Sequence, residues 1–425
     1  MLDIKFIREN PDLIKTVSKN KKVNVDIDEL LEVDSKRRKL IANIEALNQE
    51  KNEAAKTKDI QKGKMVKDNL SAIEIEYKEV AEKFSELMYK LPNFYSKDTP
   101  IGKDESENVV KKKVGEIPSF DFKPKEHWQL GEELGIIDTE TASEVSGARF
   151  SYMKGGLALL EFAVIQFVLK TLTDERILGE IIEKNNLKIS SKAFVPVLPP
   201  VMIKPEVYAR MGRLEPKDER YHIPSDDLYL IGSAEHTLGP LHMDKTIPEN
   251  NLPIRYIGFS TAFRREAGSY GKDMKGILRL HQFDKLEMES FSLPENSEAE
   301  QDFFVAIQEY IMSALKLPYQ VVNICTGDMG GPDYRQIDIE TWMPGQDRYR
   351  ETHTSDLMTD FQARRLNIKV KRTDGKTELL HMNDATASAG RTLIAILENY
   401  QTAEGTVLIP EVLKPFMFGI SEIKK

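Results

Sequence analysis

The sequence of 425 residues predicts an α+β protein, with an N-terminal antiparallel helical hairpin (a coiled coil) followed by a larger body built on an antiparallel sheet flanked by helices. Two observations support this fold class. Apolar residues repeat with heptad spacing early in the chain, and strand-like segments without a βαβ rhythm follow from about residue 126. Because the chain is too long for one ordinary core, we divide it into an arm (1–100), a linker (101–125) and a body (126–425).

The heptad is clearest in the second half of the arm, where apolar residues alternate at spacings of four and three. This seam consists of Val66, Leu70, Ile73, Tyr77, Val80, Phe84, Leu87 and Leu91. A less regular seam precedes it, at Leu30, Val33, Arg37, Leu40, Ile44, Leu47, Lys51 and Ala54. The polar segment 56–64, which contains Gly63, is the expected reversal, and Pro92 ends the second helix. The pattern favours an intramolecular hairpin over the alternative, a dimerising coiled coil.

The charge of the chain is unevenly distributed. The net charge is −9, yet residues 36–67 contain ten basic and four acidic residues. An acidic protein with one basic segment can bind a polyanion at that segment. The alternative is a lysine-rich helix face that only meets solvent.

The composition, with 40% hydrophobic and 30% charged residues, is that of a globular protein. The longest apolar stretch, residues 157–172, contains Glu161, Gln166 and Lys170, so we expect no membrane-spanning segment. The N-terminus lacks an apolar signal core, and the single Cys325 excludes an intramolecular disulfide. We expect a cytoplasmic protein without a membrane partner.

In the body, residues 157–172 have helical spacing, and several apolar runs are typical of strands. These runs are Phe194–Ile203, Leu228–Ile231, Arg255–Phe263, Gln282–Phe291, Val321–Cys325 and Ile337–Met343. The familiar nucleotide motifs are missing: no G-x-G-x-x-G follows a strand, and Asp244 replaces a required glycine in the P-loop-like segment 239–246. The seven histidines include no H-E-x-x-H pair, so no zinc is expected.

One segment pairs two strand ends across a glycine-rich loop. Phe263–Glu266 ends the first strand, residues 268–276 form the loop, and His281–Met288 belongs to the returning strand. Arg264 can hold a phosphate through two hydrogen bonds, and the Glu287 carboxylate can face the same cleft. A surface ion pair is the ordinary structural alternative.

Two further segments carry possible chemistry. Arg391 stands at the start of a predicted helix, Leu393–Tyr400, beside the positive end of the helix dipole, where an arginine is poorly placed unless an anion binds. Pro199-Pro200 follows the strand-like run that begins at Phe194. Taken alone, Arg391 could belong to a helix start whose backbone groups all have hydrogen-bond partners. Pro199-Pro200 could simply end a strand.

In this order the three segments resemble the signature motifs of class II aminoacyl-tRNA synthetases. From Met1 to about Phe418 the chain is similar to the seryl-tRNA synthetase family, and FRREAGSYGKDMKGILRLHQFDKLEM (263–288) resembles its motif 2. Residues 392–418 resemble motif 3 and the tail, and the helical hairpin is the hallmark of this family. The resemblance implies a class II antiparallel catalytic sheet, and a homodimer interface at motif 1, which corresponds to residues 157–172 and Phe194–Pro200.

The resemblance also implies the reaction. It is the ATP-dependent attachment of L-serine to tRNA(Ser) through a seryl-adenylate, with ATP and Mg²⁺ as cofactors. The sequence leaves open whether the selenocysteine tRNA, tRNA(Sec), is a further substrate. The arm would grip the tRNA through phosphate contacts of its basic residues, which include Arg37, Arg38, Lys51, Lys56, Lys58, Lys62 and Lys64.

Individual residues receive roles by the same resemblance. The catalytic residues implied are Arg264, Glu287 and Arg391. The ATP contacts implied are Arg264, Arg265, Glu266, Glu351, Thr352, His353, Thr354 and Arg391. The serine contacts implied are Ser233, Ala234, Glu235, Arg264, Glu287, Asn383 and Ala385. Glu351 and Thr354 are the implied Mg²⁺ contacts, since a carboxylate and a hydroxyl suit a hard cation.

The sequence departs from the family's pattern at several positions. Ser233 stands for a threonine and Thr354 for a serine. Where the family has Asn-Gly-Ser, Ala385 falls at the serine position and Thr386 is one residue late. Either a shifted backbone brings Thr386 into the pocket, or the contact is absent. The extra residues 174–192 have no functional explanation.

Two other functions remain as alternatives. A paralogue that charges a carrier protein would dispense with the helical arm, which is present here. A nonenzymatic scaffold would be expected to lose Arg264, Glu287 or Arg391, and all three are present.

Overall fold

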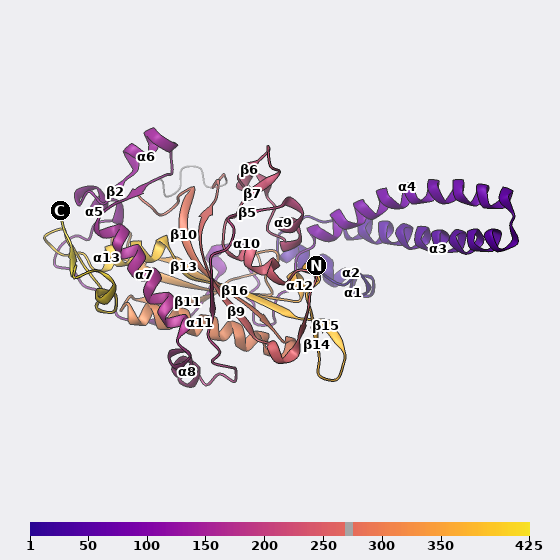
Figure 1. The fold of residues 1–425 in the computed structure, drawn as a ribbon. Coiled ribbons are helices and arrows are strands. Elements are labelled where there is room, and N and C mark those ends of the chain that lie inside the picture. The colour runs from indigo at the N-terminus through magenta and orange to yellow at the C-terminus, as the bar shows by residue number, and fades with distance from the viewer. Residues whose placement is uncertain (268–274) are drawn as a thin grey trace. The chain divides into compact units, whose positions relative to one another are not determined.

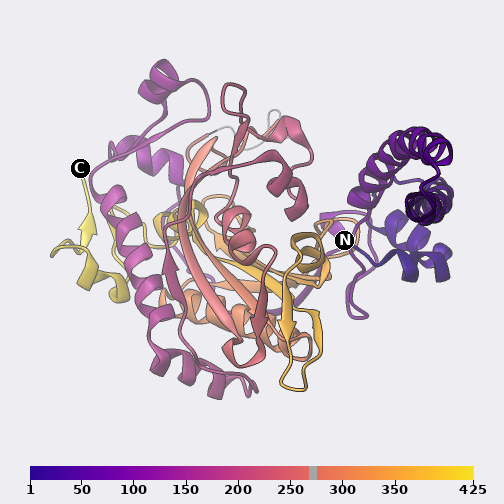
Figure 2. The same ribbon diagram turned by 45° about the vertical axis from the view of Figure 1, so that its right-hand side comes forward.

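The computed structural model describes residues 1–267 and 275–425, so most of the glycine-rich loop of motif 2 lies outside the described residues. Two compact units, Met1–Phe94 and Tyr95–Lys425, make up the structure, and each is described by itself (Figures 1 and 2). This division concerns compactness alone. The functional division into arm, linker and body stays a prediction.

The first unit is helical. Its helices are α1 (Ile4–Glu9), α2 (Pro11–Asn20), α3 (Ile27–Thr57) and α4 (Ile60–Lys90). The long helices α3 and α4 pack against each other as an antiparallel pair (Figure 1). Their buried seam residues include Leu30, Leu40, Val66, Leu70 and Leu87. The predicted helical hairpin is confirmed.

The chain reverses between α3 and α4 at Lys58 and Asp59. Lys58 adopts a left-handed conformation with φ 54°, and the Asp59 side chain accepts a hydrogen bond from the backbone N–H of Lys62, which caps α4. The reversal thus lies within the predicted segment 56–64, and Gly63 itself is part of α4. Lys58 ends α3, and Asp59 begins α4 because its carboxylate accepts from a backbone N–H that has no partner within the helix.

The charged seam residue Arg37 has a structural explanation. Its guanidinium lies 4.2 Å from the centre of the Phe84 ring on α4, a cation–π contact across the hairpin. Its Nη2 also lies 3.1 Å from Oδ1 of the buried Asp34, whose carboxylate pairs with Arg8 of α1 as well. Lys51, the other charged seam residue, is exposed.

The second unit is built on an eight-stranded sheet (Figure 2). Its strands, in spatial order, are β1 (Val109–Val114), β11 (Tyr319–Asn323), β12 (Arg335–Met343), β13 (Arg348–Thr359), β16 (His381–Ala389), β10 (Gln282–Ser292), β9 (Ile254–Phe263) and β4 (Val195–Val197). All neighbours pair antiparallel except β4 and β9, which pair parallel. The predicted α+β class with an antiparallel sheet is confirmed.

Most predicted strands lie within two residues of observed ones, namely β9, β10, β11, β12 and β7 (Leu228–Leu230). The predicted run Phe194–Ile203 is interrupted at Pro199-Pro200. Its parts are β4 and β5 (Met202–Ile203), and β5 pairs with β7 in a separate small sheet. Strands β13 and β16 were not predicted, and β1 lies within the predicted linker.

Helices pack on this sheet around one hydrophobic core. The main ones are α7 (Gly156–Thr173), α8 (Glu175–Lys184), α11 (Ser297–Ala314) and α13 (Gly390–Asn399). The extra residues after 173 form α8, which Asp174 caps and whose Leu178 and Ile181 are buried. Because α8 contacts α7 and α11, this segment extends the core.

Smaller elements complete the unit. They are α5 (His127–Glu133), α6 (Thr139–Ser146), α9 (Pro205–Met211), α10 (Glu235–Leu238), α12 (Phe361–Leu366), β2 (Ile137–Asp138), β3 (Tyr152–Met153), β6 (His222–Ile223), β8 (Thr246–Pro248), β14 (Lys369–Lys371), β15 (Thr377–Leu379), β17 (Val407–Leu408) and β18 (Glu422–Ile423).

Among the described residues, one helix, α7, has the length and hydropathy that a membrane span also needs. Its inward side chains, among them Leu157, Leu160, Val164 and Val168, belong to the core of the second unit. A core helix has the same composition as a membrane span, so the apolar character of α7 is weak evidence for a membrane.

Candidate active site

Side chains from β10, β13, β16, the first turn of α13 and the residues just after β9 converge on a cleft with two adjoining cavities, one of about 150 Å³ and one of about 600 Å³. We call them the small and the large cavity. Both are lined by Arg264, Glu266, Arg279, Lys285, Glu351, Thr354 and Arg391. These residues are far apart in the sequence, and the sheet order brings them together.

Arg264 comes directly after β9. Its backbone N–H donates to the His281 carbonyl at 3.0 Å, which keeps β9 and the approach to β10 together, and its Nε donates to the Gly232 carbonyl at 3.1 Å. The guanidinium lies 5.4 Å from the centre of the Phe283 ring. Arg264 is thus held at its Nε while it lines both cavities.

Arg391 is the second residue of α13. Its Nη1 lies 3.0 Å from Oε2 of Glu351 and donates to the Glu351 carbonyl at 2.9 Å. The walls of the cleft displace water and so raise the pKa of Glu351, but the Arg391 charge outweighs this effect and the pKa is lowered overall. The cation at the positive end of the helix therefore faces a carboxylate on β13, as the dipole requires.

Glu287 lies on β10 and is 1% exposed. Its Oε2 lies 2.5 Å from Lys285 Nζ and accepts a hydrogen bond from Ser233 Oγ at 3.2 Å. Burial raises the pKa of Glu287, and Lys285 opposes that rise. The three side chains form a compact group on the wall of the large cavity.

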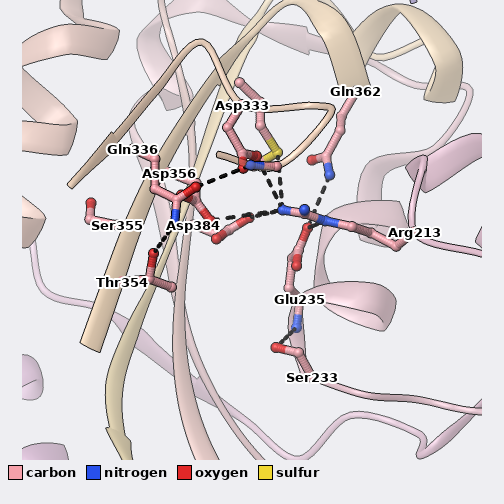
Figure 3. A network of polar contacts seen from close by, with 12 residues as sticks. Arg213, Ser233, Glu235, Asp333, Gln336, Thr354, Ser355, Asp356, Gln362 and Asp384 are labelled. Atoms are coloured by element: carbon pink, nitrogen blue, oxygen red, sulfur yellow. Dashed lines mark hydrogen bonds and ion pairs between the residues drawn. The ribbon is translucent and has the colours of Figure 1, made fainter. Parts of the chain in front are cut away.

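Glu235 begins α10 and is also buried. Its Oε1 accepts from Arg213 Nε at 2.9 Å and from Gln362 Nε2 at 3.0 Å (Figure 3). Burial raises the pKa of Glu235, but Arg213 lowers it to about 2, so the carboxylate is ionised. Sequence reasoning missed Arg213, because it lies in a loop two residues after α9 and no motif marks it.

The register of β10 and β16 bears on the choice between Ala385 and Thr386. A bulge lies between Leu286 and Glu287, where the pairing partner changes from Ser388 to Thr386. Thr386 is therefore directly opposite Glu287 and lines the small cavity. Ala385 is opposite Met288, and both belong to the hydrophobic core. Of the two residues, the bulge brings Thr386 to the cleft.

Comparison with known proteins gives two family matches. Residues 1–95 match the seryl-tRNA synthetase N-terminal domain, and residues 219–400 match the tRNA synthetase class II core domain (G, H, P, S and T). The chain is 38% identical over 430 residues to the serine–tRNA ligase of Symbiobacterium thermophilum, covering 98% of each chain. The chain belongs to the seryl-tRNA synthetase family. It is also 40% identical to the serine–tRNA ligase of Borrelia garinii subsp. bavariensis over the full length of both.

Solved members of the family share the whole fold. The crystal structure of seryl-tRNA synthetase from Pyrococcus horikoshii complexed with ATP has a TM-score of 0.86 and 36% identity, and covers 100% of this chain and 99% of its own. The cytoplasmic serine–tRNA ligase of Naegleria fowleri in complex with AMP has a TM-score of 0.83 and 29% identity, with the same coverage.

The cleft contains most of the residues that the family resemblance singled out. Besides those named above, the small cavity is lined by Thr352, whose Oγ1 donates to the Ile339 carbonyl. Among the described residues, five singled-out ones line neither cavity: Ala234, Arg265, His353, Asn383 and Ala385. Their assigned contacts stay predictions.

Each of these five residues has a structural environment of its own. The Arg265 guanidinium lies 5.7 Å from the centre of the Tyr221 ring. His353 is fully buried, with Nδ1 2.9 Å from Thr352 Oγ1, and Asn383 Nδ2 donates to the Ser297 carbonyl at 2.7 Å. Ala234 and Ala385 are fully buried.

Glu351 and Thr354 are the predicted Mg²⁺ contacts. They line both cavities, and the Glu351 side chain is 49% exposed. Among residues 1–267 and 275–425, no group of three or more His, Cys, Asp or Glu side chains is arranged to hold a metal ion. Two oxygen-bearing side chains beside a cleft fit an ion that takes its remaining ligands from phosphates and water.

Proposed function

We propose that the protein attaches L-serine to tRNA(Ser) in two steps within this cleft. ATP and serine first form seryl-adenylate and pyrophosphate, and the acyl group then passes to the terminal adenosine of the tRNA. The observation that carries the proposal is the meeting of Arg264, Lys285 and Arg391 beside the carboxylates Glu235 and Glu287. One end of the cleft thus suits phosphates, and the other suits a small amino acid with an ammonium and a hydroxyl.

In the first step a serine carboxylate oxygen attacks the α-phosphorus, and the bond to the pyrophosphate oxygen breaks. Both reactants are anionic, so the protein's contribution is positioning and charge neutralisation. Arg264 holds the α-phosphate, and Arg391 exchanges the Glu351 carboxylate for the γ-phosphate. Glu266 approaches the adenine. No side chain needs to transfer a proton in this step.

Mg²⁺ bound to the phosphates would neutralise their charge and orient them. Glu351 and Thr354 would hold it. When the γ-phosphate takes the place of Glu351 beside Arg391, the Glu351 carboxylate would be available to hold the ion.

Serine recognition uses the large cavity. Glu235, kept ionised by Arg213, accepts from the α-ammonium, and Glu287 with Ser233 meets the side-chain hydroxyl. A buried acceptor discriminates against an analogue that lacks the hydroxyl, because the acceptor would then be left without a donor. Thr386 pairs with Glu287 in the sheet and lines the adjoining small cavity, from which it supplies the hydroxyl that the family's serine would give at position 385.

The first unit binds the tRNA. Residues 1–100 act as the tRNA-binding arm, 101–125 as the linker and 126–425 as the catalytic domain. The exposed basic residues near the α3–α4 reversal, Lys51, Lys56, Lys58, Lys62 and Lys64, contact tRNA phosphates. The protein works in the cytoplasm as a homodimer, and tRNA(Sec) is a second acceptor to be tested beside tRNA(Ser).

The decisive experiment is ATP–pyrophosphate exchange with each of the twenty amino acids, followed by charging of tRNA(Ser). Exchange with serine at the highest kcat/KM, and transfer to tRNA(Ser), are expected. Exchange without transfer to any tRNA would favour a carrier-protein ligase. Absence of serine-dependent exchange would refute the proposal.

A further inference from the structure

The large cavity contains more carboxylates than serine can use. In the proposed function, which this inference builds on, Glu235 takes the ammonium of serine and Glu287 meets its hydroxyl. Two further aspartates, Asp356 of β13 and Asp384 of β16, line the same cavity. Serine has no second cationic group to offer them.

The chain's own cation does not satisfy this cluster. Nη2 of Arg213 lies 3.4 Å from Asp333, 3.5 Å from Asp384 and 3.9 Å from Asp356 (Figure 3). Full charge-assisted contacts measure about 2.7–2.9 Å. One nitrogen is therefore shared among three carboxylates and reaches none of them at full contact, while its Nε serves Glu235.

Buried oxygen atoms of the cluster have no hydrogen-bond partner in the described structure. They are Oδ1 of Asp356 and both carboxylate oxygens of Glu289, although the two residues are only 6% and 0% exposed. Glu289 lies opposite Asp384 in the sheet. Burial raises the pKa of Asp356, Asp384 and Glu289 well above its usual range. Arg213 alone does not offset the cost of burying so many carboxylates together, and a bound ammonium would supply the missing positive charge.

We propose that the large cavity also accepts a short diamino acid in place of serine, with the side-chain ammonium held by Asp356, Asp384 and Glu287. In 2,3-diaminopropionate an ammonium replaces the serine hydroxyl at nearly the same size, and in 2,4-diaminobutyrate it reaches one bond further. The reaction balances as for serine: an α-carboxylate oxygen attacks the α-phosphorus, pyrophosphate leaves, and the side-chain ammonium keeps its protons. A metal ion is a poorer occupant, since no described acidic group has the arrangement of a metal site.

The test is ATP–pyrophosphate exchange with L-2,3-diaminopropionate and L-2,4-diaminobutyrate, each compared with its neutral counterpart, alanine or 2-aminobutyrate. At least one diamino acid is expected to exceed its counterpart in kcat/KM by tenfold or more. No preference for either diamino acid would overturn the inference. Serine in the same assay separates the two proposals: with serine active and the diamino acids inactive, only this inference fails.

Two isosteric variants, Asp356→Asn and Asp384→Asn, assign the preference to the cluster. Each should lower the ratio of diamino acid to serine kcat/KM by tenfold or more, while the exposed control Asp226→Asn leaves it unchanged. An unchanged ratio in both variants would overturn the assignment. Calorimetric titration of the wild-type protein with Mn²⁺ in the absence of ATP gives a reading independent of the variants' folding. Tight binding that both Asp356→Asn and Asp384→Asn abolish would assign the cluster to a metal cation and refute the diamino acid.

Discussion

At the scale of single residues, the arginines of the cleft are held by contacts within the protein that a bound anion can replace. Arg391 is held by Glu351 on a neighbouring strand, and Arg264 is held through Nε by a backbone carbonyl. Such contacts keep the guanidinium groups in place without a bound anion. Preorganised charge of this kind is the main catalytic resource for a reaction between two anions.

We expect Arg264→Ala and Arg391→Ala each to lower the adenylation rate by at least ~100-fold, comparable to the loss of one preorganised charge contact. ATP–pyrophosphate exchange measures the effect. Arg176→Ala is the matched control, because this α8 side chain is 71% exposed. Near wild-type exchange in either cleft variant would remove that arginine from the mechanism.

Thr386→Val should erode the discrimination of serine over alanine, since it removes a hydroxyl opposite Glu287 and keeps the volume. The measurement is the ratio of kcat/KM for the two amino acids in exchange. Adding Ala385→Ser to this variant should not restore the ratio, because position 385 lies in the hydrophobic core. Discrimination unchanged in Thr386→Val would show that this hydroxyl does not reach the substrate.

His353 should make the stability depend on pH. Burial lowers its pKa from 6.5 to about 4, so the unfolded state binds more protons between these values. The free energy of unfolding should therefore fall as pH decreases from 6.5 to 4, by up to ~3 kcal/mol at 1.36 kcal/mol per pKa unit. Urea titrations of wild type and His353→Gln at pH 7 and 4.5 measure this. The prediction would be contradicted if the free energy of unfolding changed equally between the two pH values in both proteins. His222→Gln, at an exposed histidine, is the control.

At the scale of elements, two central strands of the main sheet that were not predicted, β13 and β16, carry polar residues on both faces. In β13 the buried residues include Thr352, His353, Ser355 and Asp356, and β16 is similarly polar. One face borders the cleft, and behind the other, Gln308 of α11 donates to the carbonyls of Thr354 and Thr386. Strand prediction depends on apolar alternation, which such strands lack.

The motifs predicted many residues of the candidate site, whereas the others depend on strand register and tertiary packing. Arg264 follows the end of β9, Arg391 stands at the start of α13, and Glu287 lies on β10 within the same motif as Arg264, so sequence reasoning could name them. The bulge that selects Thr386 over Ala385 depends on pairing between strands about a hundred residues apart, which no local pattern encodes. Arg213 likewise gains its role only through tertiary packing.

The helical hairpin carries a prediction of its own, because α3 and α4 pack against each other. Replacing about Arg38 to Leu87 by a short turn should leave ATP–pyrophosphate exchange intact. Charging of tRNA(Ser) at physiological salt should collapse, because phosphate contacts are lost. Full charging efficiency after the deletion would make the basic segment a solvent-exposed face only.

A charge-reversal variant is the matched control for that deletion. Lys56→Glu, Lys58→Glu and Lys62→Glu together keep the helices and remove the positive charge, and should flatten the salt dependence of tRNA binding. If the deletion abolishes exchange as well, this triple variant decides the role of the arm.

At the scale of the whole molecule, the second unit exposes large apolar side chains around α7 and β4, which contact each other. Phe162 is 55% exposed, Val195 52% and Leu198 82%. Exposed apolar side chains that gather in one region are typical of an interaction surface. They coincide with the segments that the family resemblance assigns to the dimer interface.

We therefore expect a homodimer in solution and a monomer for the double variant Phe162→Glu, Leu198→Glu. Sedimentation velocity at micromolar concentration measures the masses. Phe418→Glu, at a side chain that is 80% exposed near the C-terminus, is the control. A dimer that persists in the double variant would place the interface elsewhere.

The order of strands in the main sheet has a consequence for synthesis on the ribosome. Edge strand β1 ends at Val114, but its partner β11 begins only at Tyr319, and β16 in the middle of the sheet is made later still. The first unit is compact and lies within residues 1–94. The hairpin can therefore fold while the chain is still growing, whereas β1 must wait about two hundred residues for its partner. A nascent chain stalled near residue 250 should present a folded hairpin beside an unfinished sheet that needs chaperone protection.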